Sequence, residues 1–198
     1  MNNLEIYKEQ AQVCTACRLA EKRTNVVYGE GPENAKILII GEAPGRSEDE
    51  QAKPFVGKAG QDLTKYLIEA GLKREEVYIT NVVKCRPPEN RDPQPDEITT
   101  CTKLWLLDQI ENISPEWIIP LGNHATKFLL AGCNTEKMLE IPGISQTHGK
   151  VAQIKIKEKM HKIFPLFHPA ALIYNRALTQ EMHQDLEKFK GLLQQTIL

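Results

Sequence analysis

The chain has 198 residues, of which 41% are hydrophobic, and its formal net charge is −1. This length suits one domain with a full core, so we expect a single domain over residues 1–198. A net charge near zero gives no global attraction to nucleic acid, and any polyanion binding must come from a local basic face. The sequence has neither a membrane-spanning apolar run nor a signal-peptide pattern, which predicts a soluble, cytoplasmic protein.

Strand and helix patterns alternate along the chain. Short apolar runs rich in β-branched residues predict strands, at residues 36–41, 77–83, 117–122, 151–156 and 162–167. Helical spacing of apolar residues predicts helices, at residues 1–20 with an interruption, 59–70, 96–111, 123–131 and 179–193. The alternation without an internal repeat predicts a three-layer α/β/α sandwich with a mainly parallel central sheet of about four strands.

The first predicted strand ends in a loop with the composition of a ligand site. The loop begins Gly41-Glu42-Ala43-Pro44-Gly45 and continues through Glu48 to Phe55. Ligands of open α/β sheets bind where parallel strands end. Turn-forming residues, two carboxylates and an aromatic ring at such a place predict a site for a small planar molecule. Solvated loop charges and a buried loop anchor are the competing explanation, which composition alone does not remove.

Two further polar residues stand at predicted strand ends. The Asn81 amide either caps the backbone or binds a planar ligand, because a carboxamide offers a donor and an acceptor side by side. His168 is restrained by the following Pro169, and an imidazole there could donate to a developing oxyanion. A lone histidine is more often a surface or core residue, and we assign no function to the other histidines of the chain.

The cysteines predict metal or cluster chemistry. Their odd number, five, in a chain without an export signal argues against a disulfide framework. Cys14 and Cys17 form a CxxC pair, whereas Cys85 and Cys101 lie on a proline-rich loop and the helix after it. Four such thiolates can hold zinc or a [4Fe–4S] cluster. Buried, unligated thiols are the third explanation, which suits Cys133.

Basic residues occur at Lys84 and Arg86 on either side of Cys85, at Arg91 and as several lysines between 150 and 162. Alternating lysines along a strand usually form a solvated face. They could also form a stripe that contacts phosphates.

Taken together, these segments resemble the family 4 uracil-DNA glycosylases, the iron–sulfur branch of their superfamily. The resemblance covers nearly the whole chain. It is carried by Cys14-x-x-Cys17, Gly41 to Gly45, Pro54-Phe55-Val56-Gly57-Lys58-Ala59-Gly60, the run from Asn81 to Arg91, Cys101 and His168-Pro169-Ala170. Each motif is weak alone, but their order and spacing together are specific.

The resemblance implies a [4Fe–4S] cluster and a uracil pocket. The cluster ligands would be Cys14, Cys17, Cys85 and Cys101, and the pocket loop would comprise Gly41, Ala43, Pro44 and Gly45. Phe55 would stack on the flipped uracil, and Asn81 would bond its N3 and O4 edge, which distinguishes uracil from cytosine. Glu48 matches a position near C5, where a side chain could exclude the methyl group of thymine.

The resemblance also implies roles in the chemistry. His168 would stabilise negative charge at uracil O2, and Asn90 would assist at the pocket. Related enzymes place an Asp where this chain has Ala43, so the handling of water shifts to Glu42, which would also favour a cationic sugar. Leu172 is the expected apolar wedge that enters the duplex.

The implied function is base-excision repair by a monomeric, monofunctional enzyme. It would flip uracil from single- or double-stranded DNA and hydrolyse the N-glycosidic bond, which leaves an abasic site. One alternative is a non-catalytic DNA-binding or replication-associated module on the same fold, because a fold does not prove an activity. Another is a zinc protein that acts on a different small ligand.

Overall fold

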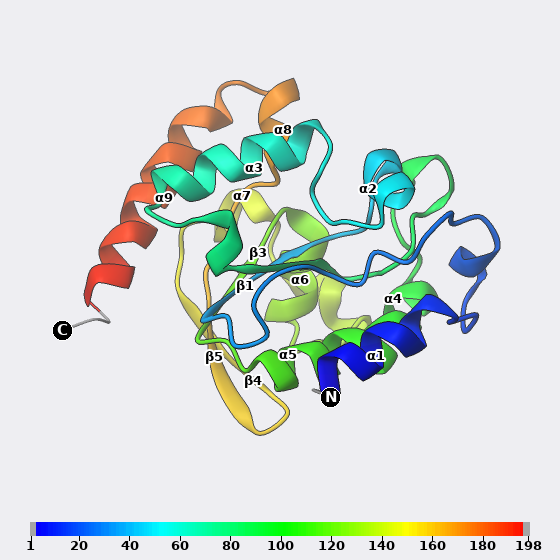
Figure 1. The fold of residues 1–198 in the computed structure, drawn as a ribbon. Coiled ribbons are helices and arrows are strands. Elements are labelled where there is room, and N and C mark those ends of the chain that lie inside the picture. The colour runs from blue at the N-terminus through cyan, green and yellow to red at the C-terminus, as the bar shows by residue number, and fades with distance from the viewer. Residues whose placement is uncertain (1–2, 196–198) are drawn as a thin grey trace.

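The structure is a computed structural model that describes residues 3–195. The ends of the predicted domain, residues 1–2 and 196–198, lie outside this range. The strands are β1 (Ile37–Gly41), β2 (Tyr78–Asn81), β3 (Trp117–Pro120), β4 (Ala152–Ile156) and β5 (Lys159–Ile163). They form one sheet in the order β2-β1-β3-β5-β4, in which only β4 runs antiparallel to its neighbour (Figure 1). The described sheet thus has five strands rather than about four.

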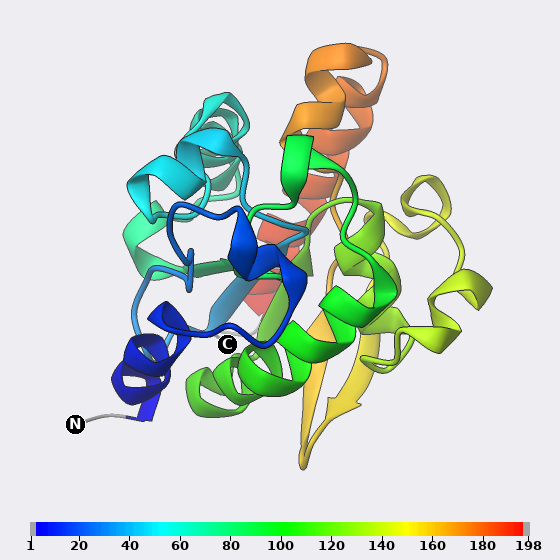
Figure 2. The ribbon, with the colours of Figure 1, turned by 90° about the vertical axis from the view of Figure 1, so that its right-hand side faces the viewer.

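Helices cover both faces of the sheet. The α-helices are α1 (Asn3–Gln12), α2 (Arg46–Gln51), α3 (Lys58–Glu69), α4 (Pro95–Cys101), α5 (Leu107–Ile113), α6 (Asn123–Leu130), α7 (Ile144–Thr147), α8 (Pro169–Tyr174) and α9 (Leu178–Gln195). Short 3-10 turns lie at Arg18–Glu21, Arg74–Glu76, Pro88–Asn90 and Glu136–Glu140, and a π turn at Thr102–Leu106 joins α4 to α5. In Figure 2, α1 and α5 lie on the viewer's side of the sheet and α9 lies behind it.

Two cores, one on each face, confirm the three-layer prediction. Successive side chains of a strand point to opposite faces. Leu38 and Ile40 of β1 therefore pack with α1, α5 and α6, whereas Ile37 and Ile39 pack with α3 and α9. The whole of β1 is buried, as expected for a strand covered on both sides.

Differences from the predicted elements have local causes. The last strand was expected at 162–167 but spans Lys159–Ile163, because β4 and β5 form a hairpin and Pro165 cannot donate to a ladder. Leu166 still bridges to Leu121. The helix expected at 96–111 begins at Pro95, where Gln94 and Glu97 form a capping box.

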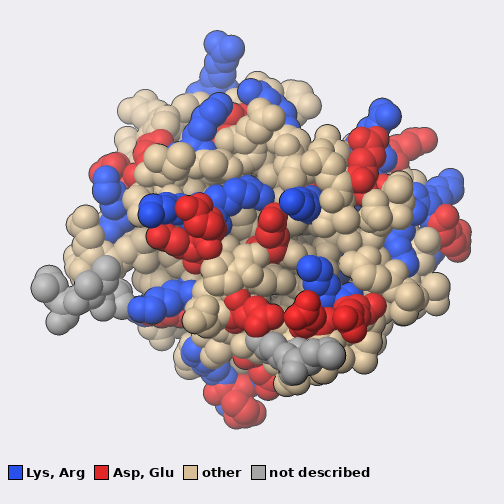
Figure 3. Space-filling view, in the orientation of Figure 1, with Lys and Arg blue, Asp and Glu red and all other residues tan. Residues whose placement is uncertain are grey.

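The lysines of the β4–β5 hairpin do not border the carboxyl edge of the parallel strands. Lys159 begins β5, and β5 runs parallel to β3, so the hairpin turn lies at the opposite edge. Lys157 pairs with Asp108 at 2.5 Å, and Lys162 pairs with Glu116 at 2.8 Å. Acidic and basic side chains also occur side by side on the face shown in Figure 3. This arrangement favours a solvated, ion-paired face over a phosphate stripe.

The parallel strands bring distant residues to one edge. Gly41 of β1 is directly opposite Asn81 of β2 in the register, and β3 ends beside them. The turn after β3 contains Gly122 at φ +83°, where a Cβ would lie 3.0 Å from the His168 Cβ. Glycine therefore allows His168 to approach this edge. Among residues 3–195, no helix is long and apolar enough to cross a membrane.

Candidate active site and cysteine pocket

A cleft of about 490 Å³ lies at the carboxyl edge of β1 and β2. Its wall contains most of the pocket residues that the sequence predicted. These are Glu42, Ala43, Pro44, Gly45, Glu48, Phe55, Asn81, Asn90 and His168. Arg91, Ala170 and Tyr174 also line it and had no assigned role in the pocket. Segments separated by more than a hundred residues in the sequence thus form one site.

Gly41 allows two of these side chains to meet. A Cβ at this position would lie 2.4 Å from the Asn81 Oδ1 and 2.6 Å from the Phe55 Cζ. Both distances are shorter than ordinary contacts of a Cβ, so a side chain at this position would displace the amide or the ring. The absence of a side chain at Gly41 is therefore what brings the amide and the ring together.

Phe55 is held in a left-handed backbone conformation, with φ at +50°. Its ring lies 5.6 Å from the His168 ring, centroid to centroid, at a tilt of 35°. Glu48 braces the loop, because its Oε1 accepts hydrogen bonds from the amides of Val56 at 2.9 Å and Gly57 at 2.8 Å. Such backbone strain persists only where the surroundings hold it. Glu48 thus has a positioning role that the sequence did not suggest.

Asn81 presents an unpaired acceptor. The residue is 1% exposed, and its Oδ1 is buried without a hydrogen-bond partner in residues 3–195. Buried polar atoms are nearly always paired, and leaving one unpaired costs about 1–3 kcal/mol. The side-chain oxygen therefore does not cap the backbone. It is suited to a ligand that brings an N–H into the cleft.

His168 is neutral and has a defined tautomer. Burial lowers its pKa below the ordinary value, and its Nδ1 accepts a hydrogen bond from the Ala170 amide at 3.2 Å. A neutral imidazole that accepts at Nδ1 carries its proton on Nε2. The ring therefore offers an uncharged N–H donor to the cleft.

Two more side chains complete the polar wall. Asn90 has φ +55°, and its Oδ1 accepts a hydrogen bond from the Arg86 Nε at 2.7 Å, which orients its amide. The Glu42 Oε2 lies 2.8 Å from the Nδ1 of His124, in the first turn of α6. Sequence reasoning assigned His124 no role. Its place directly after the end of a predicted strand was the signal that could have found it.

Leu172 belongs to the core in this structure. It is 5% exposed and packs with the core beneath α3 and α9. On the same short helix, Ile173 is 45% exposed and Tyr174 is 90% exposed, and Tyr174 also lines the cleft. The side chain that α8 presents beside the cleft is therefore Tyr174 rather than the expected Leu172.

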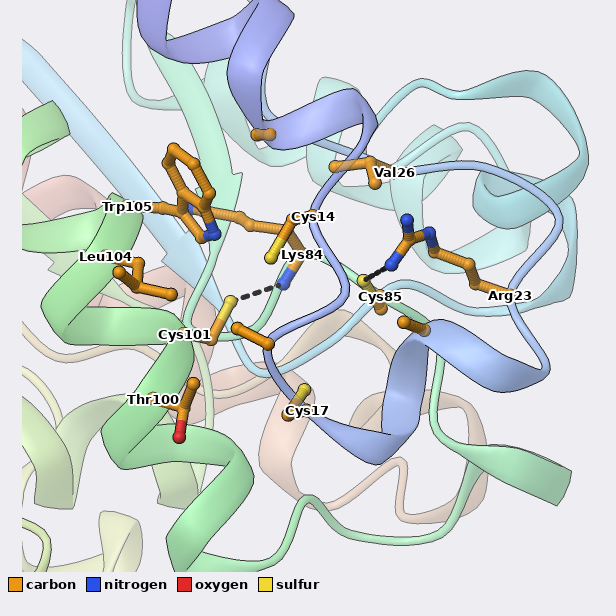
Figure 4. Close-up of a pocket in the computed structure, with 13 residues that line it drawn as sticks. Cys14, Cys17, Arg23, Val26, Lys84, Cys85, Thr100, Cys101, Leu104 and Trp105 are labelled. Atoms are coloured by element: carbon orange, nitrogen blue, oxygen red, sulfur yellow. Dashed lines mark hydrogen bonds between the residues drawn. The ribbon is translucent and has the colours of Figure 1, made fainter.

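The cysteines predicted as ligands line one small pocket (Figure 4). Cys14 and Cys17 come from the turn after α1, Cys85 from the loop after β2 and Cys101 from the end of α4. Cys133 lies elsewhere and packs against a core. The pocket therefore gathers segments from three parts of the chain.

The donor set of this pocket fits a metal centre with thiolate ligands. The Arg23 Nη1 donates to the Cys85 Sγ at 3.4 Å, and the Lys84 amide donates to the Cys101 Sγ at 3.3 Å. Burial raises the pKa of Cys101 to about 12 and also raises the pKa values of Cys17 and Cys85. A bound cation would favour the thiolates that burial disfavours. Both zinc and a [4Fe–4S] cluster are compatible with four sulfur donors.

Lys84 connects the two sites. It is 1% exposed, so it is not available to a DNA phosphate. Its Nζ donates to the Thr80 Oγ1, to the Asn81 carbonyl at 2.8 Å and to the Gln109 Oε1 at 2.6 Å. Burial lowers its pKa to about 7. Sequence patterns did not indicate this buried network, because it joins Lys84 to a residue of a distant helix.

An aromatic ring, an unpaired amide oxygen and a neutral imidazole at the carboxyl edge of a parallel sheet define a class of protein that binds a flat, hydrogen-bonding heterocycle. Residues 28–190 match the model of the family described as the uracil DNA glycosylase superfamily. The chain belongs to this superfamily, in its type-4 branch.

Three relatives support this assignment. The chain is 46% identical to a type-4 uracil-DNA glycosylase of Sulfurisphaera tokodaii, over 97% of this chain and 86% of that protein. It is 43% identical to the type-4 enzyme of Saccharolobus solfataricus, over 98% and 88% of the two chains. It is also 43% identical to that of Archaeoglobus fulgidus, over 97% and 94%. The resemblance inferred from the motifs is confirmed.

The brace at Glu48 can be tested by Glu48→Ala. Two charge-assisted hydrogen bonds to the loop amides are lost while Phe55 keeps its strained conformation, so we expect the free energy of unfolding to fall by about 2–4 kcal/mol. Denaturant unfolding measures the change. Glu50→Ala, which removes an exposed carboxylate from the same helix, should change stability by less than about 0.5 kcal/mol. Equal stabilities of the two variants would contradict the brace.

Proposed function

We propose that the protein is a uracil-DNA glycosylase of base-excision repair. It takes uracil out of the base stack and hydrolyses the N-glycosidic bond, which releases free uracil and leaves an abasic site. Membership of the superfamily supports the reaction class. The observation that carries the proposal is the buried Oδ1 of Asn81, which lies beside the ring of Phe55 and has no hydrogen-bond partner among residues 3–195. We propose further that the enzyme acts inside the cell as a monomer.

Base recognition follows from the chemistry of Asn81. Uracil presents a donor at N3 and an acceptor at O4, whereas cytosine presents an acceptor at N3 and a donor at N4. The Asn81 Oδ1 would accept the N3 proton of uracil. Against cytosine, two acceptors would face each other in a buried site, and neither would be paired. Phe55 supplies the face on which the flipped base stacks.

The reaction separates charge, and the cleft has groups for both signs. As the N-glycosidic bond breaks, its electron pair leaves with uracil, and the neutral Nε2–H of His168 stabilises the negative charge at O2. The carboxylate of Glu42 favours the positive sugar and accepts a proton from the water that adds to C1′. The cleft wall, within residues 3–195, includes no lysine that could form a Schiff base. Hydrolysis without a lyase step is therefore proposed.

The four pocket cysteines would hold a [4Fe–4S] cluster. The donor set and the two N–H···S contacts support this ligation. When bound, the cluster would supply metal–sulfur bonds that cross-link the turn after α1, the loop after β2 and α4. The same loop after β2 carries Asn90 into the cleft, so the cross-link would help to hold the active-site wall.

The base-recognition proposal is tested with a uracil-containing oligonucleotide and Asn81→Ala. We expect the wild type to produce abasic sites on single- or double-stranded substrate. The variant should lose about a hundred-fold or more in kcat/KM, as when one donor or acceptor of a buried site is removed. Asn134→Ala, which changes an exposed asparagine outside the cleft wall, is the matched control. A wild type that binds the substrate without cleaving it would instead be a non-catalytic module.

We propose Tyr174, rather than Leu172, as the wedge that takes the place of the flipped base. The test compares Tyr174→Ala with Leu172→Ala. A wedge is needed only to take the place of a base in a duplex, so Tyr174→Ala should slow excision from double-stranded DNA about tenfold and leave single-stranded DNA nearly unchanged. Tyr174→Phe keeps the ring and should behave as the wild type. Leu172→Ala should lower stability by about 2–5 kcal/mol. A selective duplex defect in Leu172→Ala alone would assign the wedge to Leu172.

The cluster proposal is tested by Cys85→Ser. We expect this variant to lose the broad visible absorbance of an iron–sulfur protein and to unfold at a lower temperature than the wild type. Cys133→Ala should keep the absorbance, because Cys133 lies outside the pocket. A colourless wild type, purified without oxygen and containing stoichiometric zinc, would contradict the cluster.

A further inference from the structure

His124 bridges two carboxylates at the rim of the cleft. Its Nδ1 lies 2.8 Å from the Glu42 Oε2, and its Nε2 lies 3.7 Å from the Asp92 Oδ2. The side chains of His124 and Glu42 are 29% and 30% exposed, whereas Asp92 is 76% exposed. The Glu42 carboxylate therefore contacts the His124 imidazole and also lines the cleft.

The backbone fixes this arrangement. Glu42 directly follows β1, and its carbonyl accepts a hydrogen bond from the Val83 amide at 3.1 Å. His124 lies in the first turn of α6, whose entry is set by Gly122. The Asn123 Oδ1 accepts a hydrogen bond from the Ile144 amide at 3.1 Å, which ties this turn to α7. Glu42 and His124 thus face each other from two anchored segments.

We propose that His124 is a positioning residue for Glu42 and that its charge sets the pH dependence of uracil excision. This inference rests on the proposed function, in which Glu42 handles water and favours the positive sugar. In either protonation state, the Nδ1–H can donate to Glu42 and hold the carboxylate in place. A protonated ring also cancels part of the negative charge of Glu42, which weakens both of its roles.

The charges around His124 determine when it loses its proton. Glu42 at the end of β1 and Asp92 on the proline-rich loop favour the charged ring, whereas Lys127 on α6 itself and burial oppose it. The carboxylates prevail, and the pKa of His124 is raised above its ordinary value, chiefly by the hydrogen bond to Glu42. The ring is therefore charged below this raised pKa and neutral above it. Uracil excision should accelerate as the pH rises through the pKa of His124.

The kinetic test measures single-turnover excision between about pH 5 and pH 9, across the range in which histidine titrates. The wild type should show a rate that rises with pH and levels off. His124→Asn places an amide N–H near the position of Nδ1 but has no titrating ring. This variant should keep most of the plateau rate, but its rate should no longer rise with pH over the range in which histidine titrates. His124→Ala should lower the plateau about tenfold or more, because the hydrogen bond to the carboxylate is lost.

Asp92→Asn is the matched variant outside the cleft wall. It removes one of the two carboxylates that favour the charged ring. The rise of the excision rate should therefore occur at lower pH, while the plateau rate stays unchanged. Circular dichroism and thermal unfolding at each pH show whether the variants remain folded. Identical pH profiles in the wild type, His124→Asn and Asp92→Asn would overturn the inference.

A measurement that does not depend on activity separates this inference from the proposed function. The His124 ring is titrated by NMR in the wild type and in Asp92→Asn. A pKa above the ordinary range that falls in the variant supports the bridge, even if no uracil is excised. A His124 that titrates as a free histidine in both proteins would overturn it, whether or not the enzyme excises uracil.

Discussion

The close approach of Gly41, Asn81 and Phe55 is the constraint on which the cleft depends. Gly41 and Asn81 face each other across the β1–β2 ladder, so any side chain at Gly41 would enter the space that the amide and the ring share. The parallel register supplies the alignment, and the absence of a Cβ supplies the room. Glu48 then holds the Phe55 loop against the same point. One strand pair thus determines where a flat ligand can lie.

The cleft combines a neutral histidine and a carboxylate that contacts another histidine. Burial keeps His168 uncharged, whereas hydrogen bonding to Glu42 favours the charged form of His124. Their different surroundings therefore shift the pKa values of the two imidazoles in opposite directions. In the proposed reaction, the uncharged His168 donor serves the leaving base, and the Glu42 carboxylate serves the positive sugar.

The loop after β2 belongs to both sites. Its first residues include Lys84, whose Nζ is bonded to the Asn81 carbonyl and whose amide contacts the Cys101 sulfur. Lys84 lines the cysteine pocket and also bonds the buried side chains of Thr80 and Gln109. A disturbance of the cysteine pocket therefore has a short structural route to Asn81. Through this route, the proposed cluster would have a structural role that requires no electron transfer.

The sequence by itself determined the layer architecture, the strand-end loops and most of the residues of the cleft. Buried β-branched runs, helical periodicity and Gly–Pro loops are local signals, and the motif order identified the family. Only the tertiary structure decided the roles of Glu48, His124, Lys84 and Tyr174. Each depends on a contact or an exposure created by segments that are far apart in the chain. Burial made Lys84 a hydrogen-bond donor inside the protein and placed Leu172 in the core, because packing, not residue type, sets what a side chain can reach.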